Sequence, residues 1–178
     1  MKDMRRNGIT YRFGDDITPT NLRKAQVEEY AGTVAAKLAY QVGANPKDLA
    51  THLGGTIHFQ SLDDMMEESG SIFVHAKNDF DILLAQYTSP IRDRFTLAHE
   101  IGHYFLHSNQ GDVPIVATRR GSTRIEWEAN WFAAELLMPK KEFKRIHKEL
   151  QDWPAIAYHF KVSVDAAKVR GLSLGIAS

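Results

Sequence analysis

The first strong hydrophobic pattern in the chain covers about residues 20–42. Apolar residues recur there at intervals of three and four, the spacing that places them on one face of an α-helix. Thr18-Pro19 before the pattern is typical of a helix start, and Gly43 after it is typical of a helix end. The pattern predicts a long helix that acts as a core scaffold, followed by a short helix at residues 46–53.

The spacing changes after residue 55. Residues 56–60 alternate between polar and apolar side chains, residues 71–75 do so more weakly, and residues 81–87 form an apolar run. Short stretches of this kind, separated by polar connections, are typical of β-strands. We therefore predict three strands that pair mostly antiparallel through hairpin-like links.

Helical spacing returns in the second half of the chain. We predict helices at residues 89–108, 123–138, 139–150, 153–160 and 163–170, with a long connection at residues 109–123. The predicted fold class is α+β, with a small three-stranded sheet packed with about six helices around a central helix at residues 89–108. We expect a single domain over residues 1–178, with a loose arm at 1–18 and a helical hairpin at 153–174.

The central helix contains His99-Glu100-Ile101-Gly102-His103, which is an HExxH motif. Residues four apart lie on one face of a helix with Cβ atoms roughly 5–6 Å apart, so His99 and His103 can bind one metal ion. Glu100 lies one residue round the helix, where it can reach a water at the metal without being a ligand. This is the arrangement of a general base in a zinc hydrolase. The alternative interpretation is two ordinary histidines on a surface helix.

A catalytic zinc site usually has three protein ligands and one open position. His107 lies eight residues beyond His99, about 12 Å along a helix axis, so the two cannot bind the same ion. We expect His107 to support a ligand or to interact with the helix end. The longer motif HExxHxxGxxH is excluded, because Leu106 and Asn109 stand where it needs glycine and histidine.

The remaining candidates for the third ligand are acidic residues of the next predicted helix. Glu126 borders its apolar face on the side of the small residues Ala129 and Ala133, which would let the motif helix approach closely. Glu128 borders the same face on its other side. We predict that Glu126 is the third ligand and keep Glu128 as the alternative, unless both are solvated helix charges. Asn130, one turn beyond Glu126, could hold the outer nitrogen of a ligand histidine.

Composition narrows the chemistry of any site. The 178 residues include no cysteine, so disulfides and thiolate metal sites are excluded, and a metal must use His, Asp or Glu. Lys and Arg number 22, as do Asp and Glu, so the net charge of zero gives no global attraction for nucleic acid or anionic membranes. The chain has no apolar run of about 18 residues and no signal-peptide pattern, so we expect a cytoplasmic protein.

Two segments of the chain resemble the ImmA/IrrE family of metallopeptidases. They are Arg94-Phe-Thr-Leu-Ala-His-Glu-Ile-Gly-His-Tyr-Phe-Leu-His107 and Glu126-x-x-Ala-Asn-x-Phe-Ala-Ala-x-Leu-Leu-Met-Pro139. The order of elements from about residue 20 to residue 170 also fits, including the closing Phe160-x-Val-Ser-x-x-Ala-x-x-x-Arg170 stretch. One departure is Gly171, where the family pattern more often has leucine.

This resemblance implies a zincin-like core in which a glutamate three residues before the Ala-Asn pair completes the metal site, which supports Glu126. It also implies a protein substrate, namely a helix-turn-helix repressor or antitoxin whose cleavage releases stress, phage or mobile-element genes. Neither direct contact with nucleic acid nor contact with a membrane is expected.

The resulting hypothesis is a zinc-dependent endopeptidase in which His99, His103 and Glu126 hold the ion and Glu100 is the general base. Manganese, iron or cobalt are alternatives, because a site with two histidines and one glutamate also accepts them. A residue that stabilises the oxyanion is expected among a few neighbours of the motif: Tyr104, His107, Arg92 and Arg94.

Two other hypotheses belong to different functional classes. The first is a non-catalytic regulatory partner whose zinc is structural, although a structural site would not need Glu100. The second is a DNA-binding regulator built on residues 156–170, whose spacing resembles a helix-turn-helix. Only Lys161, Lys168 and Arg170 are basic there, which favours a packing hairpin over a DNA-binding motif.

Overall fold

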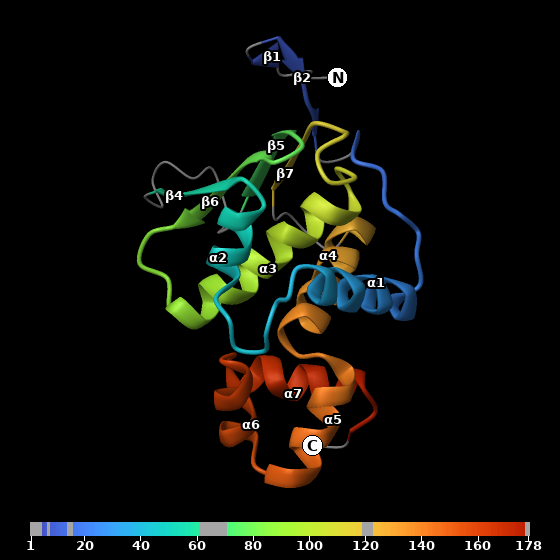
Figure 1. The fold of residues 1–178 in the computed structure, drawn as a ribbon, viewed down its shortest axis with the longest axis vertical. Helices are drawn as coiled ribbons and strands as arrows, with labels where there is room; N and C mark the ends of the chain where they lie inside the picture. Colours follow the sequence, from blue (N-terminus) through green and yellow to red (C-terminus); the bar gives the residue numbers. More distant parts are fainter. Residues whose placement is uncertain (1–4, 7, 14–15, 61–70, 119–122, 177–178) are drawn as a thin grey trace.

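The structure is a computed structural model that describes residues 5–6, 8–13, 16–60, 71–118 and 123–176. Within these residues the chain forms seven helices and seven strands (Figure 1). The strands are β1 (Arg5–Arg6), β2 (Ile9–Thr10), β3 (Arg12–Phe13), β4 (Gly55–Gln60), β5 (Ser71–Ala76), β6 (Asp79–Ala85) and β7 (Ile115–Thr118). The helices are α1 (Lys24–Lys37), α2 (Pro46–His52), α3 (Pro90–Leu106), α4 (Arg124–Leu137), α5 (Lys140–Leu150), α6 (Trp153–Phe160) and α7 (Val164–Ser173).

The main sheet has five strands in the order β3-β7-β5-β6-β4, so the prediction of three strands was too small. The predicted antiparallel hairpin is present between β5 and β6, and β5 also pairs antiparallel with β7. The two outer strands were not predicted to pair as they do, because β4 runs parallel to β6 and β3 runs parallel to β7. The fold is α+β as expected, but the sheet is mixed.

The two strands of the main sheet that sequence analysis missed lie in segments interpreted as irregular. β7 occupies part of the predicted connection 109–123, and β3 lies in the predicted loose arm 1–18, where β1 and β2 also form a small antiparallel hairpin. Residues 1–4, 7, 14–15 and 119–122 of these segments lie outside the described residues. β7 and β3 are too short for their own side-chain pattern to signal a strand, and each becomes one through its neighbour in the sheet.

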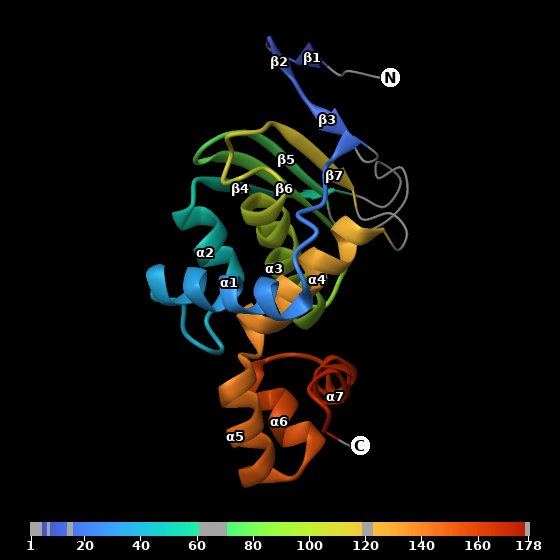
Figure 2. The same cartoon turned by 90° about the vertical axis from the view of Figure 1, so that its right-hand side faces the viewer.

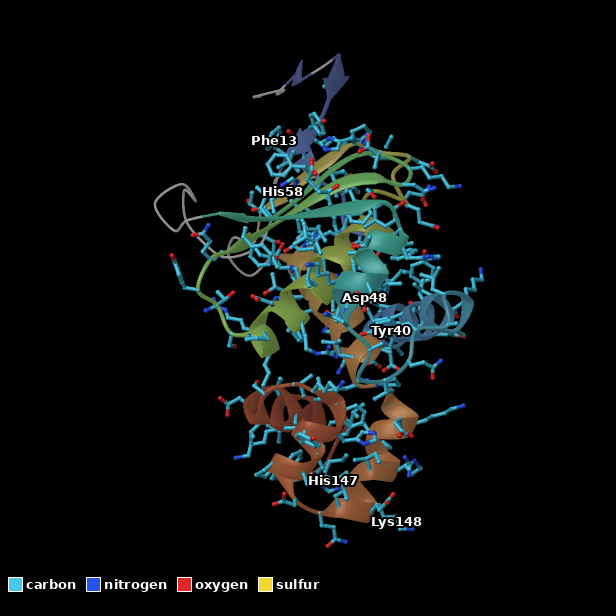
Figure 3. All side chains as sticks on the ribbon, turned by 60° about the vertical axis from the view of Figure 1, so that its left-hand side comes forward. Phe13, Tyr40, Asp48, His58, His147 and Lys148 are labelled. Carbon is cyan, nitrogen blue, oxygen red and sulfur yellow. The ribbon has the colours of Figure 1, made fainter. Side chains whose placement is uncertain are left out.

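Helices α1 to α4 lie on one side of the sheet (Figure 2), and α2 and α3 contact it directly. The side chains that face them alternate along the strands and are fully buried, as expected for a sheet with one covered face: Ile72, Val74, Phe80, Ile82, Ile115 and Ala117. The other face is polar in part. There, His58 (labelled in Figure 3) and His75 both donate to the carboxylate of Asp81 at 2.8 Å, and Tyr11 donates to His75. These bonds join β4, β5 and β6 to Tyr11, the residue just before β3.

The first long helix is shorter than predicted, covering Lys24–Lys37 instead of about 20–42. Near its start, the backbone N–H and hydroxyl of Thr20 donate to the carboxylate of Glu128 at 2.9 and 2.8 Å. Asn21 then has a φ of 58°, which a right-handed helix does not accommodate. At the other end, Ala39 has a φ of 50°. A contact with a residue far along the chain thus decides where the helix begins.

The centre of the molecule is the packing of α3 against α4, in the layer below the sheet (Figures 1 and 2). Gly102 of α3 lies at the contact. A Cβ atom on Gly102 would lie 3.2 Å from the Ala129 carbonyl oxygen and 3.3 Å from the Cβ of Phe132. Ala129 and Ala133 of α4 are both fully buried there. The two helices approach this closely because the facing residues are small.

The last three helices, α5 to α7, form a group at one end of the molecule, far from the sheet (Figures 1 and 2). Arg170 of α7 joins this group to the rest, since its buried guanidinium donates to Glu28 of α1, to Glu135 of α4 and to the carbonyl oxygen of Met138. Gly171, the departure from the family pattern, has a structural reason. A Cβ atom there would lie 2.6 Å from the Trp153 ring, which fills the space of a larger side chain.

The membrane prediction has a partial test in the structure. Within the described ranges, none of the helices combines the length with the apolar composition that a membrane crossing requires.

We expect Gly102→Ala to lower the free energy of unfolding by about 1–3 kcal/mol, because the added methyl group must displace the α4 backbone at Ala129. Thermal and urea unfolding by circular dichroism would measure the change. Gly32→Ala is the matched control, since Gly32 lies on the exposed side of α1 with no atom within 4 Å of an added Cβ. That variant should be stabilised by roughly 0.5–1 kcal/mol through helix propensity. Equal effects in the two variants would contradict the close-packing argument.

Candidate metal centre

Helix α3 places the motif residues at the centre of the molecule. Its start is well defined, because Pro90 occupies the first position and the Ser89 hydroxyl accepts a hydrogen bond from the Arg92 backbone at 3.2 Å. From Thr96 to Phe105 every residue of α3 is buried, including His99, Glu100 and His103. Three polar side chains on the buried part of one helix need partners, and the structure shows where these lie.

Helix α4 brings Glu126 to the two histidines. Its Oε2 atom lies 3.1 Å from His99 Nε2, its Oε1 atom lies 3.3 Å from His103 Nε2, and the two Nε2 atoms are 3.0 Å apart. One ligand atom from each of the three residues falls within 4.8 Å of the others. Two imidazoles from one helical turn and a carboxylate from the next helix therefore converge on one point.

The outer nitrogen of each histidine has a partner that sets its tautomer. His99 Nδ1 lies 3.0 Å from Asn130 Oδ1, an acceptor, so a neutral His99 carries its hydrogen there and a lone pair on Nε2. His103 Nδ1 lies 3.0 Å from His107 Nδ1, and His107 Nε2 lies 3.1 Å from Glu128 Oε2. When His107 donates to Glu128, its Nδ1 accepts from His103, which likewise leaves a lone pair on His103 Nε2.

This donor set fits a divalent cation. Burial raises the pKa of Glu126, but the adjacent His103 and His99 outweigh burial and lower it to about 2, so the carboxylate is ionised. Its Oε1 atom is buried and accepts no hydrogen bond within the described part of the chain. Two imidazole lone pairs and a carboxylate repel one another unless a positive charge lies between them, and two histidines with one glutamate form a known catalytic zinc set.

Behind the histidines lies a second buried charge, Glu128. Its carboxylate accepts hydrogen bonds from His107, from Thr20 and from Arg124 Nε at 3.0 Å. Burial would raise the pKa of Glu128, but these bonds lower it to about 2. Burial also lowers the pKa of His107, which keeps this ring neutral and able to accept from His103. Glu128 therefore supports His103 through His107 and lies apart from the point where His99, His103 and Glu126 converge.

The structure separates the predicted site residues into groups. His99, His103 and Glu126 are brought together, and Asn130 and His107 hold the outer nitrogens of the two rings. Glu100 is buried next to His99 on the same helix. Thr20 and Arg124 also belong to the site, and sequence analysis missed both. No local pattern marks Thr20, which contacts a glutamate 108 positions away, whereas the spacing of four residues between Arg124 and Glu128 on one helix was a signal that could have indicated their contact.

The candidates for stabilising an oxyanion also differ in position. The Tyr104 hydroxyl accepts from the Asn78 backbone at 3.2 Å and its ring packs on Phe80, which argues against Tyr104 for this role. Arg94 donates to the carbonyl oxygen of Lys161 at 2.9 Å. His107 lies behind His103 and is engaged there. Arg92 lines the cleft that reaches Glu126, and it remains a predicted oxyanion residue.

The family model described as IrrE N-terminal-like domain, named Peptidase_M78, matches residues 50–171. The chain belongs to this family. The resemblance to ImmA/IrrE metallopeptidases that the motifs indicate is thus confirmed, and membership indicates a metal-dependent peptidase. The matched region includes β4 to β7, the three candidate metal ligands and almost all of the C-terminal helix group.

Solved structures include a similar chain, a Mycobacterium tuberculosis transcriptional regulator, with a TM-score of 0.59 and 19% sequence identity. The match covers 86% of this chain and 48% of that one, so this chain spans about half the length of the regulator. At this identity the likeness shows the fold alone. A comparison with curated proteins gave no match.

We expect Glu126→Gln to weaken zinc binding far more than Glu128→Gln, because only Glu126 faces both Nε2 atoms. Loss of an outer partner weakens metal binding by roughly 10- to 100-fold, so the Glu128 variant should stay within that range and the Glu126 variant should exceed it. Competition titration against a zinc chelator measures both affinities. A reversed order would make Glu128 the ligand.

His107→Ala should weaken zinc binding roughly 10- to 100-fold, because His103 loses the acceptor that fixes its ring. His52→Ala, at an exposed histidine of α2, is the control and should leave zinc affinity unchanged. Unfolding of both variants without metal shows how much of the change is lost stability. If a folded His107 variant binds zinc as tightly as the wild-type protein, His107 does not support the metal centre.

Proposed function

We propose that this protein is a metal-dependent endopeptidase, most naturally a zinc enzyme, that cleaves a helix-turn-helix repressor or antitoxin at a specific site. The observation that carries the proposal is the convergence of His99, His103 and Glu126 with Glu100 adjacent on the same helix. A structural metal site has no use for a buried carboxylate at that position. Family membership supports a peptidase, and the motif resemblance supports the repressor as the substrate.

A divalent ion held by these three side chains would supply a Lewis acid that polarises the substrate carbonyl and acidifies the attacking water. Glu100 takes the proton of that water and passes it to the leaving amine. Asn130 and His107 hold the ligand rings in the orientation that binding requires. We assign to Arg92, which lines the cleft, the stabilisation of the negative charge that develops on the carbonyl oxygen.

A DNA-binding regulator is the principal alternative, and one observation favours it. Residues 140–178 contain eight Lys and Arg against four Asp and Glu. However, Arg170 is buried in bonds to Glu28 and Glu135, and Arg145 is paired with Glu142 and Glu149. The exposed surface of α7 carries one lysine, Lys168, beside the hydrophobic residues Val164, Val169 and Leu172, whereas a helix that reads bases needs several polar groups. The arrangement therefore supports the peptidase more strongly.

We expect Glu100→Gln to lower the rate of cleavage by about 10²- to 10⁴-fold while zinc binding persists, because the amide cannot take the proton. The assay incubates the zinc-loaded protein with the repressor encoded beside its gene and follows fragments on a gel. Glu149→Gln, at an exposed glutamate of α5, is the matched control and should cleave normally. Removal of the metal by a chelator should stop cleavage, and added zinc should restore it.

Two outcomes of this assay would contradict the proposal. If the Glu100→Gln protein still cleaves the repressor, Glu100 is not the general base. A wild-type protein that leaves the repressor intact with zinc, manganese, iron and cobalt, yet regulates its genes in cells, would favour the non-catalytic partner.

A further inference from the structure

A cleft of about 1140 Å³ reaches the candidate metal centre from the side of the C-terminal helices. One wall comes from α3 and α4 and includes Thr96, Glu126 and Asn130, so the cleft touches a predicted ligand and the partner of another. The opposite wall comes from α7 and the turn that precedes it. Pockets for small ligands are usually about 300–1,000 Å³, so this cleft has room for a stretch of polypeptide.

The α7 wall is held in place by hydrogen bonds to α1, α3 and α4. Arg170 of α7 donates to Glu28, to Glu135 and to the Met138 carbonyl oxygen. Arg94 of α3 donates to the carbonyl oxygen of Lys161, in the turn between α6 and α7. Since α3 and α4 also carry His99, His103 and Glu126, the wall has a defined position relative to the candidate metal ligands.

Large apolar side chains are exposed on three sides of this cleft. Ile91 at the start of α3 is 46% exposed, Trp127 of α4 is 47% exposed and Val169 of α7 is 65% exposed, and all three line the cleft. They come from segments far apart in the sequence. Exposed apolar side chains that cluster beside a candidate active site usually mark a binding surface, whereas single exposed apolar residues are common on any protein.

The exposed side chains of α7 also indicate which class of molecule this wall can bind. Its largely exposed hydrophobic residues are Val164, Val169 and Leu172, and its one arginine is buried. Lys168 is the remaining basic residue of the helix and Asp165 offsets its charge. Nucleic acid would find little to bind here, whereas an apolar side chain of a protein substrate would be removed from water.

We propose that α7 is the outer wall of the substrate cleft, and that Ile91, Trp127 and Val169 select a polypeptide with a large apolar residue beside the bond presented to the metal centre. The proposal rests on the proposed function for the reaction itself. It gives the helix-turn-helix-like pair α6–α7 a role in selecting the substrate. Burying a leucine or phenylalanine side chain in such a cleft strengthens binding by roughly ten- to a hundredfold.

The test measures binding without cleavage, using hydroxamates, which chelate zinc. The full-length zinc-loaded protein is titrated by calorimetry with the hydroxamates of N-acetyl-glycine, N-acetyl-leucine and N-acetyl-phenylalanine. We expect the leucine or phenylalanine compound to bind at least tenfold more tightly than the glycine compound. In Val169→Glu this preference should fall below threefold, because a charge then lies on the apolar wall, while the glycine compound binds as before.

Tyr158→Glu is the matched control. Tyr158 of α6 is 86% exposed and is not among the residues that line the cleft, so the same substitution should leave the preference intact. Should Val169→Glu fail to fold, Trp127→Ala removes apolar surface from the opposite wall and should reduce the preference in the same way.

The outcomes separate this inference from the proposed function. Equal affinity for the three compounds in the wild-type protein would overturn it, as would equal loss of preference in the Val169 and Tyr158 variants. Failure of every hydroxamate to bind would overturn it as well. If the wild-type protein prefers the leucine or phenylalanine hydroxamate but cleaves no repressor, the proposed role of the cleft is supported and the proposed peptidase reaction is contradicted.

Discussion

The close approach of α3 and α4 is the constraint on which the rest of the structure depends. The contact at Gly102, with Ala129 and Ala133 opposite, leaves no room for a Cβ atom without displacement of the α4 backbone. Because the helices lie this close, Glu126 reaches both His99 and His103, and Asn130, one turn further on α4, reaches the outer nitrogen of His99. A wider separation would leave the carboxylate out of reach of one imidazole or of both. The small residues thus do more than fill the core, since they set the geometry of the candidate metal centre.

Behind His103, buried polar groups form a continuous chain of hydrogen bonds that leads outward from this contact. His103 is held by His107, His107 by Glu128, and Glu128 by Thr20 and Arg124. An unpaired charge in the interior is costly, so each partner is needed by the one before it. The chain of bonds also connects the metal centre to the segment before α1, because Arg124 donates to the Leu22 carbonyl oxygen as well. The N-terminal part of the molecule is therefore joined to the site by polar contacts, in addition to the strand β3.

The C-terminal helices belong to the site in the same sense. Arg170 satisfies two carboxylates from α1 and α4, and its bond to the Met138 carbonyl oxygen fixes α7 where α4 ends. Of the two helices whose spacing resembles a DNA-binding motif, α7 lines the cleft that leads to Glu126. Its apolar exposed side chains fit a protein partner. Fold resemblance alone, including the likeness to a transcriptional regulator, would not distinguish these roles, since function follows from the residues at the surface.

The sequence by itself determined the helices whose signals are local. Ser89-Pro90 marks the start of α3, the short helix from Pro46 and the helices α4 to α7 lie within a few residues of their predicted bounds, and the HExxH spacing places His99 and His103 on one face of a helix. It could narrow the third ligand to Glu126 or Glu128 but left their roles as a prediction. Only the tertiary structure decided that β7 and β3 are strands, that α1 begins after Thr20, that Glu128 supports His107, and that Arg170 is buried. The physical reason is the separation along the chain of the residues that interact. Caps and helical periodicity act within a few residues, whereas strand pairing and the compensation of a buried charge depend on residues that are distant in the chain and meet only after folding.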